Sequence, residues 1–288
     1  MTSVEVQVLR SIRDIPREEW DALALPEASP FLEWTWLATL EDAGCVGGDS
    51  GWIPLPLVVR RGSELIACAP AYAKLHSEGE FVFDWSWAEL AGRLGAPYYP
   101  KLVLAVPFTP ATGRRVLVAP GEDRDELTAV LAAAARKLLP AFGGSSVHVL
   151  FPPEDELAAW EKAGLFPRVG FQFQWRNEGY ADMPAFLARF NAKKRHQLRR
   201  EMSQPARDGV AIETVAPEAL DAALVAQMYA FYTSTVDKYF YGRRYLTRPF
   251  FELIAARWAH RLAWVTARRG DALLAGAFNV KKGKRLYG

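Results

Sequence analysis

The sequence predicts a mixed α/β protein in which sheets are flanked by helices, arranged as two related units in tandem. The chain has 288 residues, of which 50% are hydrophobic and 12% aromatic, so it can bury about two cores. Segments typical of strands alternate along it with segments typical of helices, an order that indicates a mixed α/β fold. The third observation is an internal repeat, because residues 59–69 and 267–277 read nearly alike.

The repeated segment has the signature of a β-hairpin. Each copy holds a strand, a tight Arg-Arg-Gly turn and a second strand in which small and apolar residues alternate. Strands and helices continue for roughly another hundred residues after the first copy, whereas few residues separate the second copy from Gly288. We therefore predict a first domain over residues 1–178 and a second over 179–288, the second incomplete at its C-terminal end.

Alternation and short apolar runs predict the other strands. Alternating side chains indicate strands at 4–9 and 171–175, and apolar runs indicate strands at 102–106, 116–118 and 146–151.

Apolar residues spaced three and four apart predict the helices. The clearest is 125–139, which has acids at its start and Arg136 and Lys137 at its end, before Pro140. Further helices are predicted at 17–20, 31–43, the later part of 81–95, 154–163, from Asp182 onward, around 193–200, 218–236 and 249–260.

Composition limits the class of protein. A formal net charge of +2 is too small for a nucleic-acid partner across the whole surface, so such a partner would need a local patch. Cys45 and Cys68 have no metal-ligand spacing, and we expect buried thiols in a reducing compartment and no metal site. The start of the chain lacks the apolar core of a signal peptide, and the apolar run 127–135 is too short to span a bilayer. We expect a cytoplasmic protein.

The order of elements resembles the acyl-CoA N-acyltransferase fold, and its doubling resembles the Fem-type aminoacyltransferases that build peptidoglycan bridges. The local motifs are similar to those of the bacterial Fem-like family described as peptidoglycan biosynthesis or recognition proteins, and they cover nearly the whole chain. They lie at residues 76–85, 98–101, 107–110, 145–148, 175–180, 193–195, 199–201, 245–248 and 286–288.

This resemblance implies an activity. It implies transfer of an acyl or aminoacyl group from an acyl-CoA or an aminoacyl-tRNA to an amine of a small or nucleotide-linked acceptor. The chain departs from the family pattern at Gln174, where a histidine usually stands, so no role for that ring is expected here. Members of the family also continue past the 286–288 motif.

Three residues are candidates for catalysis. Asp84 follows an aromatic stretch beside Trp85, where burial would raise the pKa of its carboxyl and suit it to general-base work; the other interpretation is a helix cap. His76 belongs to the same stretch, and Asp237 follows an aromatic helix that could line a groove between the units. His148 lies inside an apolar strand, which favours a neutral, hydrogen-bonded core imidazole over a base.

Cations and aromatic residues are the candidates for substrate binding: Trp85, Arg114, Arg115, Arg176, Tyr180, Lys194, Arg195, Arg199 and Lys238. The basic run 193–200 could hold the phosphates of a nucleotide-linked precursor, a tRNA or an anionic lipid, or it could be a solvated helix face paired with acids. The turn at Arg114 and Arg115 could bind an anion or be a plain turn.

Two further segments bear on the function. Residues 121–126 place four carboxylates before and within the start of the clearest helix, so we expect no coenzyme A pyrophosphate there and assign any donor site to the second unit. Residues 48–51 look like a serine-protease loop without its framework, and we interpret them as a flexible loop.

The resemblance therefore implies an acyltransferase, and we expect it to hold its acceptor in a groove between the units. The alternative is a non-catalytic protein of the same fold that recognises a peptidoglycan precursor or an anionic ligand through the basic helix.

Overall fold

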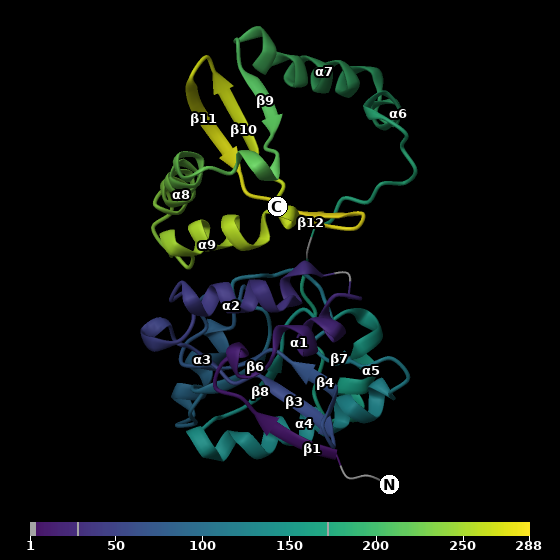
Figure 1. Cartoon of the computed structure of the whole chain (residues 1–288), viewed down its shortest axis with the longest axis vertical. Helices are drawn as coiled ribbons and strands as arrows, with labels where there is room; N and C mark the ends of the chain where they lie inside the picture. Colours follow the sequence, from purple (N-terminus) through teal and green to yellow (C-terminus); the bar gives the residue numbers. More distant parts are fainter. Residues whose placement is uncertain (1–3, 28, 172) are drawn as a thin grey trace.

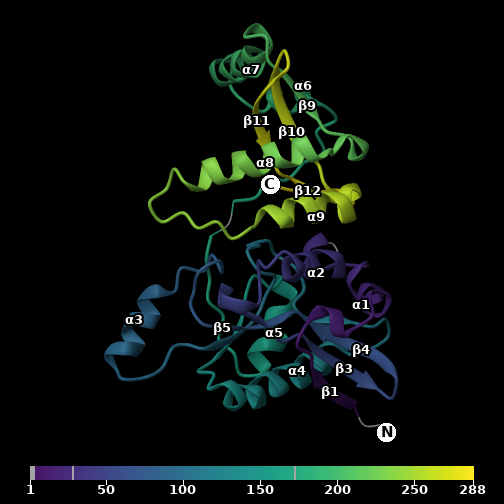
Figure 2. The same ribbon diagram turned by 60° about the vertical axis from the view of Figure 1, so that its left-hand side comes forward.

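The structure is a computed structural model that describes residues 4–27, 29–171 and 173–288. It has two lobes, one above the other in Figure 1, and a turn of the view keeps them separate (Figure 2). We call residues 4–163 the N-terminal lobe, 164–182 the linker and 183–288 the C-terminal lobe. The C-terminus lies near the junction of the lobes, and the N-terminus lies at the far end of the N-terminal lobe.

The N-terminal lobe contains strands and helices in alternation. Its strands are β1 (Val4–Val8), β2 (Trp52–Pro54), β3 (Leu57–Arg61), β4 (Glu64–Ala69), β5 (Ala71–Lys74), β6 (Lys101–Leu104), β7 (Leu117–Val118) and β8 (Val147–Val149). Its α-helices are α1 (Arg17–Ala24), α2 (Trp34–Asp42), α3 (Trp85–Arg93), α4 (Arg124–Leu138) and α5 (Glu154–Lys162).

The strands of this lobe form two four-stranded sheets. One arm of the hairpin contains β2 and β3, the other contains β4 and β5, and each arm gives one strand to each sheet. The orders are β1-β3-β4-β7 and β2-β5-β6-β8. Pro56 separates β2 from β3 and Pro70 separates β4 from β5, yet the amide of Leu55 still donates to the carbonyl of Ala71 at 2.8 Å. Strands β6 and β8 run parallel, with α4 between them in sequence. The prolines therefore bend one continuous surface into two sheets.

Helices cover both faces of these sheets. Leu131, Ala135 and Trp160 of α4 and α5 belong to one buried cluster with Ile66 and Leu104 of the strands. Residues of α1 and α2 belong to the other cluster, which continues into the C-terminal lobe. The predicted fold class, a mixed α/β fold with sheets flanked by helices, is confirmed.

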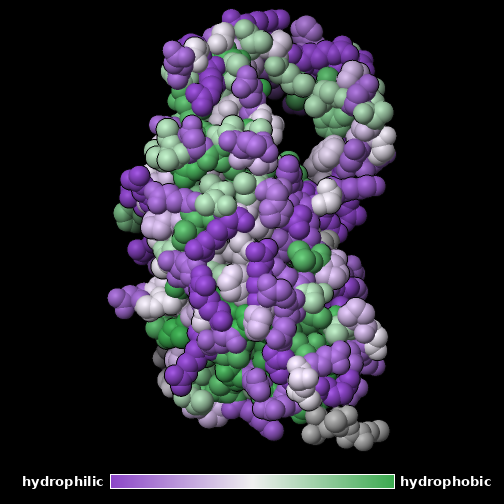
Figure 3. Space-filling model, viewed as in Figure 1, coloured by the Kyte–Doolittle hydropathy of each residue, from purple (hydrophilic) through white to green (hydrophobic). Residues whose placement is uncertain are grey.

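The C-terminal lobe begins with α6 (Met183–Ala188), α7 (Ala192–Arg207), β9 (Ala211–Thr214), α8 (Ala222–Val236) and α9 (Arg248–Trp258). It continues with β10 (Val265–Arg269), β11 (Ala272–Ala277), β12 (Val280–Lys282) and β13 (Arg285–Tyr287). The linker, α6 and α7 arch away from the three-stranded sheet β11-β10-β9, and Figure 3 shows an opening beside this arch.

The sequence repeat is also a structural repeat. In β3 and β4 the register shifts between Val59 and Arg60, and in β10 and β11 it shifts between Ala267 and Arg268. The shift therefore falls immediately before the first arginine of each turn. Each hairpin also pairs antiparallel with a strand that precedes two helices, β1 in the N-terminal lobe and β9 in the C-terminal lobe. Both predicted hairpins are confirmed.

The sequence was wrong about the strand at 171–175. In the described part of this segment the backbone is irregular, and Phe171 and Phe173 are fully exposed; Gln172 lies outside the described residues. An alternating pattern becomes a strand only beside a partner strand, and none pairs with this segment within the described ranges. The predicted boundary at residues 178 and 179 falls in the linker, and the division into two homologous domains stays a proposal.

The lobes meet through α2 and α9. The ring of Trp36 lies 5.3 Å from those of Phe250 and Trp258. The buried carboxylate of Glu33 accepts hydrogen bonds from Trp258 Nε1 at 2.9 Å and Arg261 at 2.7 Å. In the portion of the chain described, no helix combines the length and apolar character needed to cross a membrane.

Candidate functional site

A cavity of about 920 Å³ lies at the junction of the lobes. The N-terminal lobe contributes residues 44–50, Trp52, His76 and Glu78, and the C-terminal lobe contributes residues 243–245 and Thr247. A groove between the units was expected to hold the acceptor. The cavity lies between the lobes, and its volume is in the range of pockets that bind small ligands.

A glycine-rich loop forms one wall of the cavity. Gly44, Gly47, Gly48 and Gly51 all have left-handed backbone conformations, with φ between 49° and 84°. A Cβ at Gly51 would lie 2.1 Å from His76 Nε2. Only glycine therefore allows the imidazole to pack against this loop. Residues 48–51 were interpreted as a flexible loop and not as part of a site, although the density of glycines before a strand is a signal for this wall.

Aromatic side chains join the two lobes at the cavity. The ring of Phe108 stacks on Tyr245, with centroids 5.0 Å apart and an angle of 11° between planes. Trp52 meets Phe108 edge-on at 5.4 Å. Close by, Arg243 forms an ion pair of 3.1 Å with Glu78. These contacts hold the loop 243–247 against the N-terminal lobe.

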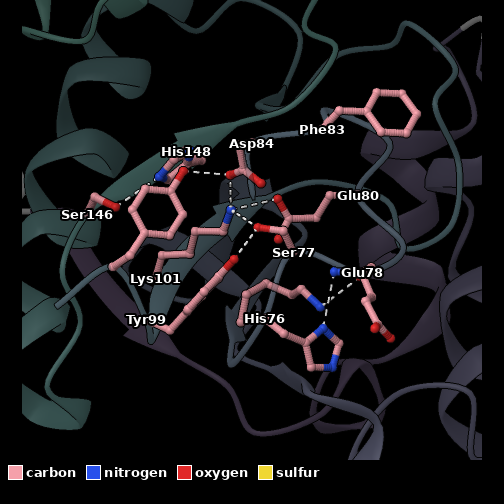
Figure 4. A network of polar contacts seen from close by, with 12 residues as sticks. His76, Ser77, Glu78, Glu80, Phe83, Asp84, Tyr99, Lys101, Ser146 and His148 are labelled. Carbon is pink, nitrogen blue, oxygen red and sulfur yellow. Dashed lines mark hydrogen bonds and ion pairs between the residues drawn. The ribbon is translucent and has the colours of Figure 1, made fainter. Parts of the chain in front are cut away.

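Behind the cavity wall lies a buried polar network, which Figure 4 shows. Lys101 Nζ donates to Asp84 at 2.5 Å, Glu80 at 2.8 Å and Ser77 at 3.2 Å. Lys74, the register partner of Lys101, donates to the carbonyl of Glu78 at 3.2 Å. The segment 75–84 carries His76 and Glu78 in the cavity lining, and the two lysines bond to other groups of the same segment.

The network fixes the protonation of its members. Burial raises the pKa of Asp84, but hydrogen bonds from Lys101, Ser77 and Tyr98 outweigh it and lower the pKa to about 2. The predicted rise is therefore wrong, because a buried lysine, distant in sequence, lies beside the carboxylate. Asp84 does stand at the N-cap position of α3, yet its side chain makes no capping hydrogen bond. Burial raises the pKa of Glu80 and lowers that of Lys74 to about 7.

His76 is the predicted catalytic residue that lines the cavity. Its Nδ1 accepts the amide hydrogen of Glu78 at 3.2 Å. Burial and the charge of Lys74 lower the pKa of the ring, so it is neutral at pH 7. His148 is also neutral: burial and Lys101 lower its pKa to about 4, and Ser146 Oγ lies 2.9 Å from its Nε2 (Figure 4).

Asp237 and Lys238 are exposed at the end of α8, outside the cavity. Arg244, which lines the cavity, donates through Nε to Asp237 at 2.9 Å, and this hydrogen bond lowers the pKa of the carboxyl. Asp237 therefore acts on the cavity only through Arg244.

The other predicted binding residues of the N-terminal lobe are scattered. Trp85 is 54% exposed at the start of α3. Arg114 pairs with Asp155 at 2.9 Å. Arg115 is buried and donates to the carbonyls of Leu150 and Gly113, each at 2.6 Å. Because its donors are used inside the fold, Arg115 is not free to bind a ligand, and it is corrected to a structural residue.

The remaining predicted residues lie in the linker and on α7, and none of them belongs to the cavity lining. Arg176 and Tyr180 belong to the linker, and Tyr180 donates to Glu178 at 2.8 Å. The cations of α7 that were predicted to bind substrate are Lys194, Arg195 and Arg199. They form no ion pair with any residue described, so a helix face paired with acids is not what the structure contains.

The start of α4 is occupied by the protein's own acids. Asp123 Oδ1 accepts the amide hydrogen of Glu126 at 3.0 Å, and Glu122 pairs with Arg61. In the ranges described, no group of three or more His, Cys, Asp or Glu side chains could hold a metal ion.

Comparison with known proteins places the chain in a family. A model of the FemAB-like family, described as peptidoglycan biosynthesis/recognition, matches residues 11–288, and the chain belongs to this family. No curated protein matches it.

Several solved structures are similar to parts of the chain. A ribosomal-protein-alanine N-acetyltransferase from Brucella melitensis biovar Abortus 2308 has 10% identity and a TM-score of 0.37, over 60% of this chain and 100% of its own. An aminoglycoside antibiotic 6'-N-acetyltransferase from Acinetobacter baumannii has 14% identity and a TM-score of 0.38, over 62% and 100%. FemX has 16% identity and a TM-score of 0.45 over 88% of this chain, which spans 56% of the FemX chain.

Proposed function

We propose that this protein transfers an acyl or aminoacyl group to an amine of a peptidoglycan-related acceptor held in the junction cavity. The observation that carries the proposal is a cavity with walls from both lobes in a chain of the FemAB-like family. Its aromatic wall can cover the apolar part of an acceptor, and its charged side chains can orient the ends.

Acyl transfer to an amine requires few catalytic side chains. The lone pair of the acceptor nitrogen attacks the acyl carbon, the bond from that carbon to the sulfur or oxygen of the donor breaks, and the amine gives up one proton. The leaving thiolate or alkoxide takes up a proton in turn. Of the three predicted catalytic residues, His76 alone lines the cavity and is neutral at pH 7, so we retain it as the candidate base; to take up the proton, its Nδ1 must release the amide hydrogen of Glu78.

The proposed donor is an acyl-CoA or an aminoacyl-tRNA, and both place the reaction in the cytoplasm. Because Asp123 caps α4, we assign the donor to the C-terminal lobe. The unpaired cations of α7 support this assignment, since phosphate groups bind such side chains.

An assay of amide formation tests the proposal. The full chain is incubated with a nucleotide-linked muropeptide and either acyl-CoAs or charged tRNA, and products are identified by mass spectrometry. Tyr245→Ala should lower the rate of amide formation by about tenfold or more, since its ring forms the cavity wall. Tyr241→Ala is the matched control, because this tyrosine is 83% exposed and lies outside the lining.

A non-catalytic recognition protein is the second candidate. It is favoured by the capped start of α4 and by the engaged Nδ1 of His76. Under this alternative the muropeptide raises the melting temperature of the full chain, and no donor yields an amide.

A further inference from the structure

The charged side chains of the junction cavity can be sorted by whether they already have an ion-pair or hydrogen-bond partner within the protein. Three cations and three carboxylates line it: Arg10, Arg243, Arg244, Glu41, Asp49 and Glu78. A charge with an internal partner holds the wall in place, and a charge without one is available to a ligand.

Two of the cations and two of the carboxylates have partners. Arg243 pairs with Glu78 across the junction at 3.1 Å. Arg244 donates to Asp237 at 2.9 Å. Glu41 accepts from the amide of Ile12 at 3.0 Å and from the hydroxyl of Ser11.

Arg10 and Asp49 remain. In the described part of the chain, neither side chain forms a hydrogen bond or an ion pair, and the two do not pair with each other. Both are exposed, and they come from different elements: Arg10 follows β1, and Asp49 lies in the glycine-rich loop. The fold thus holds one guanidinium and one carboxylate apart on the lining of one cavity.

We propose that the cavity selects a zwitterionic acceptor, with its ammonium group beside Asp49 and its carboxylate on Arg10. This inference rests on the proposed function, which requires an amine, and it adds that the amine belongs to an amino-acid-like end bearing an acidic group. A ligand with both charges satisfies both free side chains, whereas a simple amine leaves the guanidinium without a partner. A guanidinium also matches the planar geometry of a carboxylate. Asp49 and Arg10 are positioning residues in this account.

Binding of three probes of matched length tests it by isothermal titration on the full chain. The monoamide of mono-N-acetyl-diaminopimelate, amidated at its acetylated end, has a free end with both charges. Nα-acetyl-lysine amide has an ammonium group only, and N-acetyl-2-aminopimelate 1-amide has a carboxylate only. The zwitterionic probe should bind about tenfold more tightly than either of the others. Equal affinity for all three would overturn the proposal.

Variants assign the two charges. Asp49→Asn should weaken binding of the zwitterionic and ammonium probes about tenfold and leave binding of the carboxylate probe unchanged. Arg10→Met should weaken binding of the zwitterionic and carboxylate probes about tenfold and leave binding of the ammonium probe unchanged. Asp271→Asn and Arg207→Met are controls, since both residues are exposed and outside the cavity. The proposal would be overturned if Asp49→Asn and Arg10→Met bind all three probes with the same affinities as the control variants.

The readout separates this proposal from the proposed function. If amide forms equally fast on the ammonium probe and the zwitterionic probe, the function stands and the selectivity is wrong. If the zwitterionic probe binds selectively but no donor acylates it, the selectivity stands and the transferase is wrong.

Discussion

At the scale of single residues, the buried lysines decide how the cavity wall is held. Lys101 is fully buried and bonds to both Asp84 and Glu80. Lys101→Met leaves these carboxylates without their cation, and it should lower the free energy of unfolding by about 3–5 kcal/mol. Urea unfolding at pH 7 measures the change, with the exposed Lys284→Met as control. A loss equal to that of the control would refute the role of Lys101.

Lys74 gives the molecule an unusual pH dependence. Burial lowers its pKa from 10.5 to about 7 in the folded state, so the unfolded chain binds more protons between these values. Stability should therefore rise with pH above 7, at no more than about 1.4 kcal/mol per pH unit.

The comparison of wild type with Lys74→Met isolates this effect. Glu78, Glu80, Asp84, Lys101 and His76 surround Lys74 and stay in both proteins. Between pH 7 and 9 the wild type should gain about 1–2 kcal/mol relative to the variant in urea unfolding. A difference that stays constant with pH would contradict the lowered pKa.

Residue types predicted the members of the site poorly, since one of the twelve candidate residues lines the cavity. His76 was expected near the chemistry and lines the cavity. The environment of Asp84 could not be read from its neighbours in sequence, because Lys101 reaches it from the distant strand β6. The positions of Lys74 and Lys101 did indicate a buried polar network. Lys74 is the last residue and Lys101 the first residue of a short, otherwise apolar strand, where a lysine needs a buried partner.

At the scale of elements, the glycine-rich loop has the sharpest requirement. Gly51→Ala would place a methyl group against His76 and would also strain a left-handed backbone with φ of 71°. Gly48→Ala meets the backbone strain alone, since nothing lies within 4 Å of its added Cβ. We expect Gly51→Ala to lower the thermal midpoint more than Gly48→Ala and to displace the His76 ring, which NMR can follow. Equal midpoints would show that the ring does not rest on this loop.

Elements with caps and long periodicity could be predicted, and those that depend on a distant partner could not. The helix expected at 125–139 is α4, which has Asp123 as its cap. The strand β9 was missed because it is short and exposed along its whole length. Residues 171–175 have the right alternation but no neighbouring strand in the described chain.

At the scale of the whole molecule, Glu33 joins the lobes. Burial raises the pKa of this carboxyl, but Arg261, Lys282 and Trp258 outweigh it and lower the pKa below 4.5. Glu33→Gln should cost about 3 kcal/mol of unfolding free energy at pH 7. The exposed Glu218→Gln is the control.

The cost of Glu33→Gln should shrink with acid. A lowered pKa stabilises the fold above pH 4.5, and this contribution is lost as the pH falls below that value. Urea unfolding at pH 7 and about pH 3 measures it. A cost that does not change between these pH values would contradict a charged Glu33 at the junction.

The two lobes form one site in this account, and hydrogen–deuterium exchange tests that claim most directly. The full chain is compared with and without a nucleotide-linked muropeptide. We predict slower exchange in residues 44–51 and 76–78 of the N-terminal lobe and in 243–247 of the C-terminal lobe, because these segments carry most of the cavity lining. Protection confined to α7, or to one lobe, would contradict a shared acceptor site.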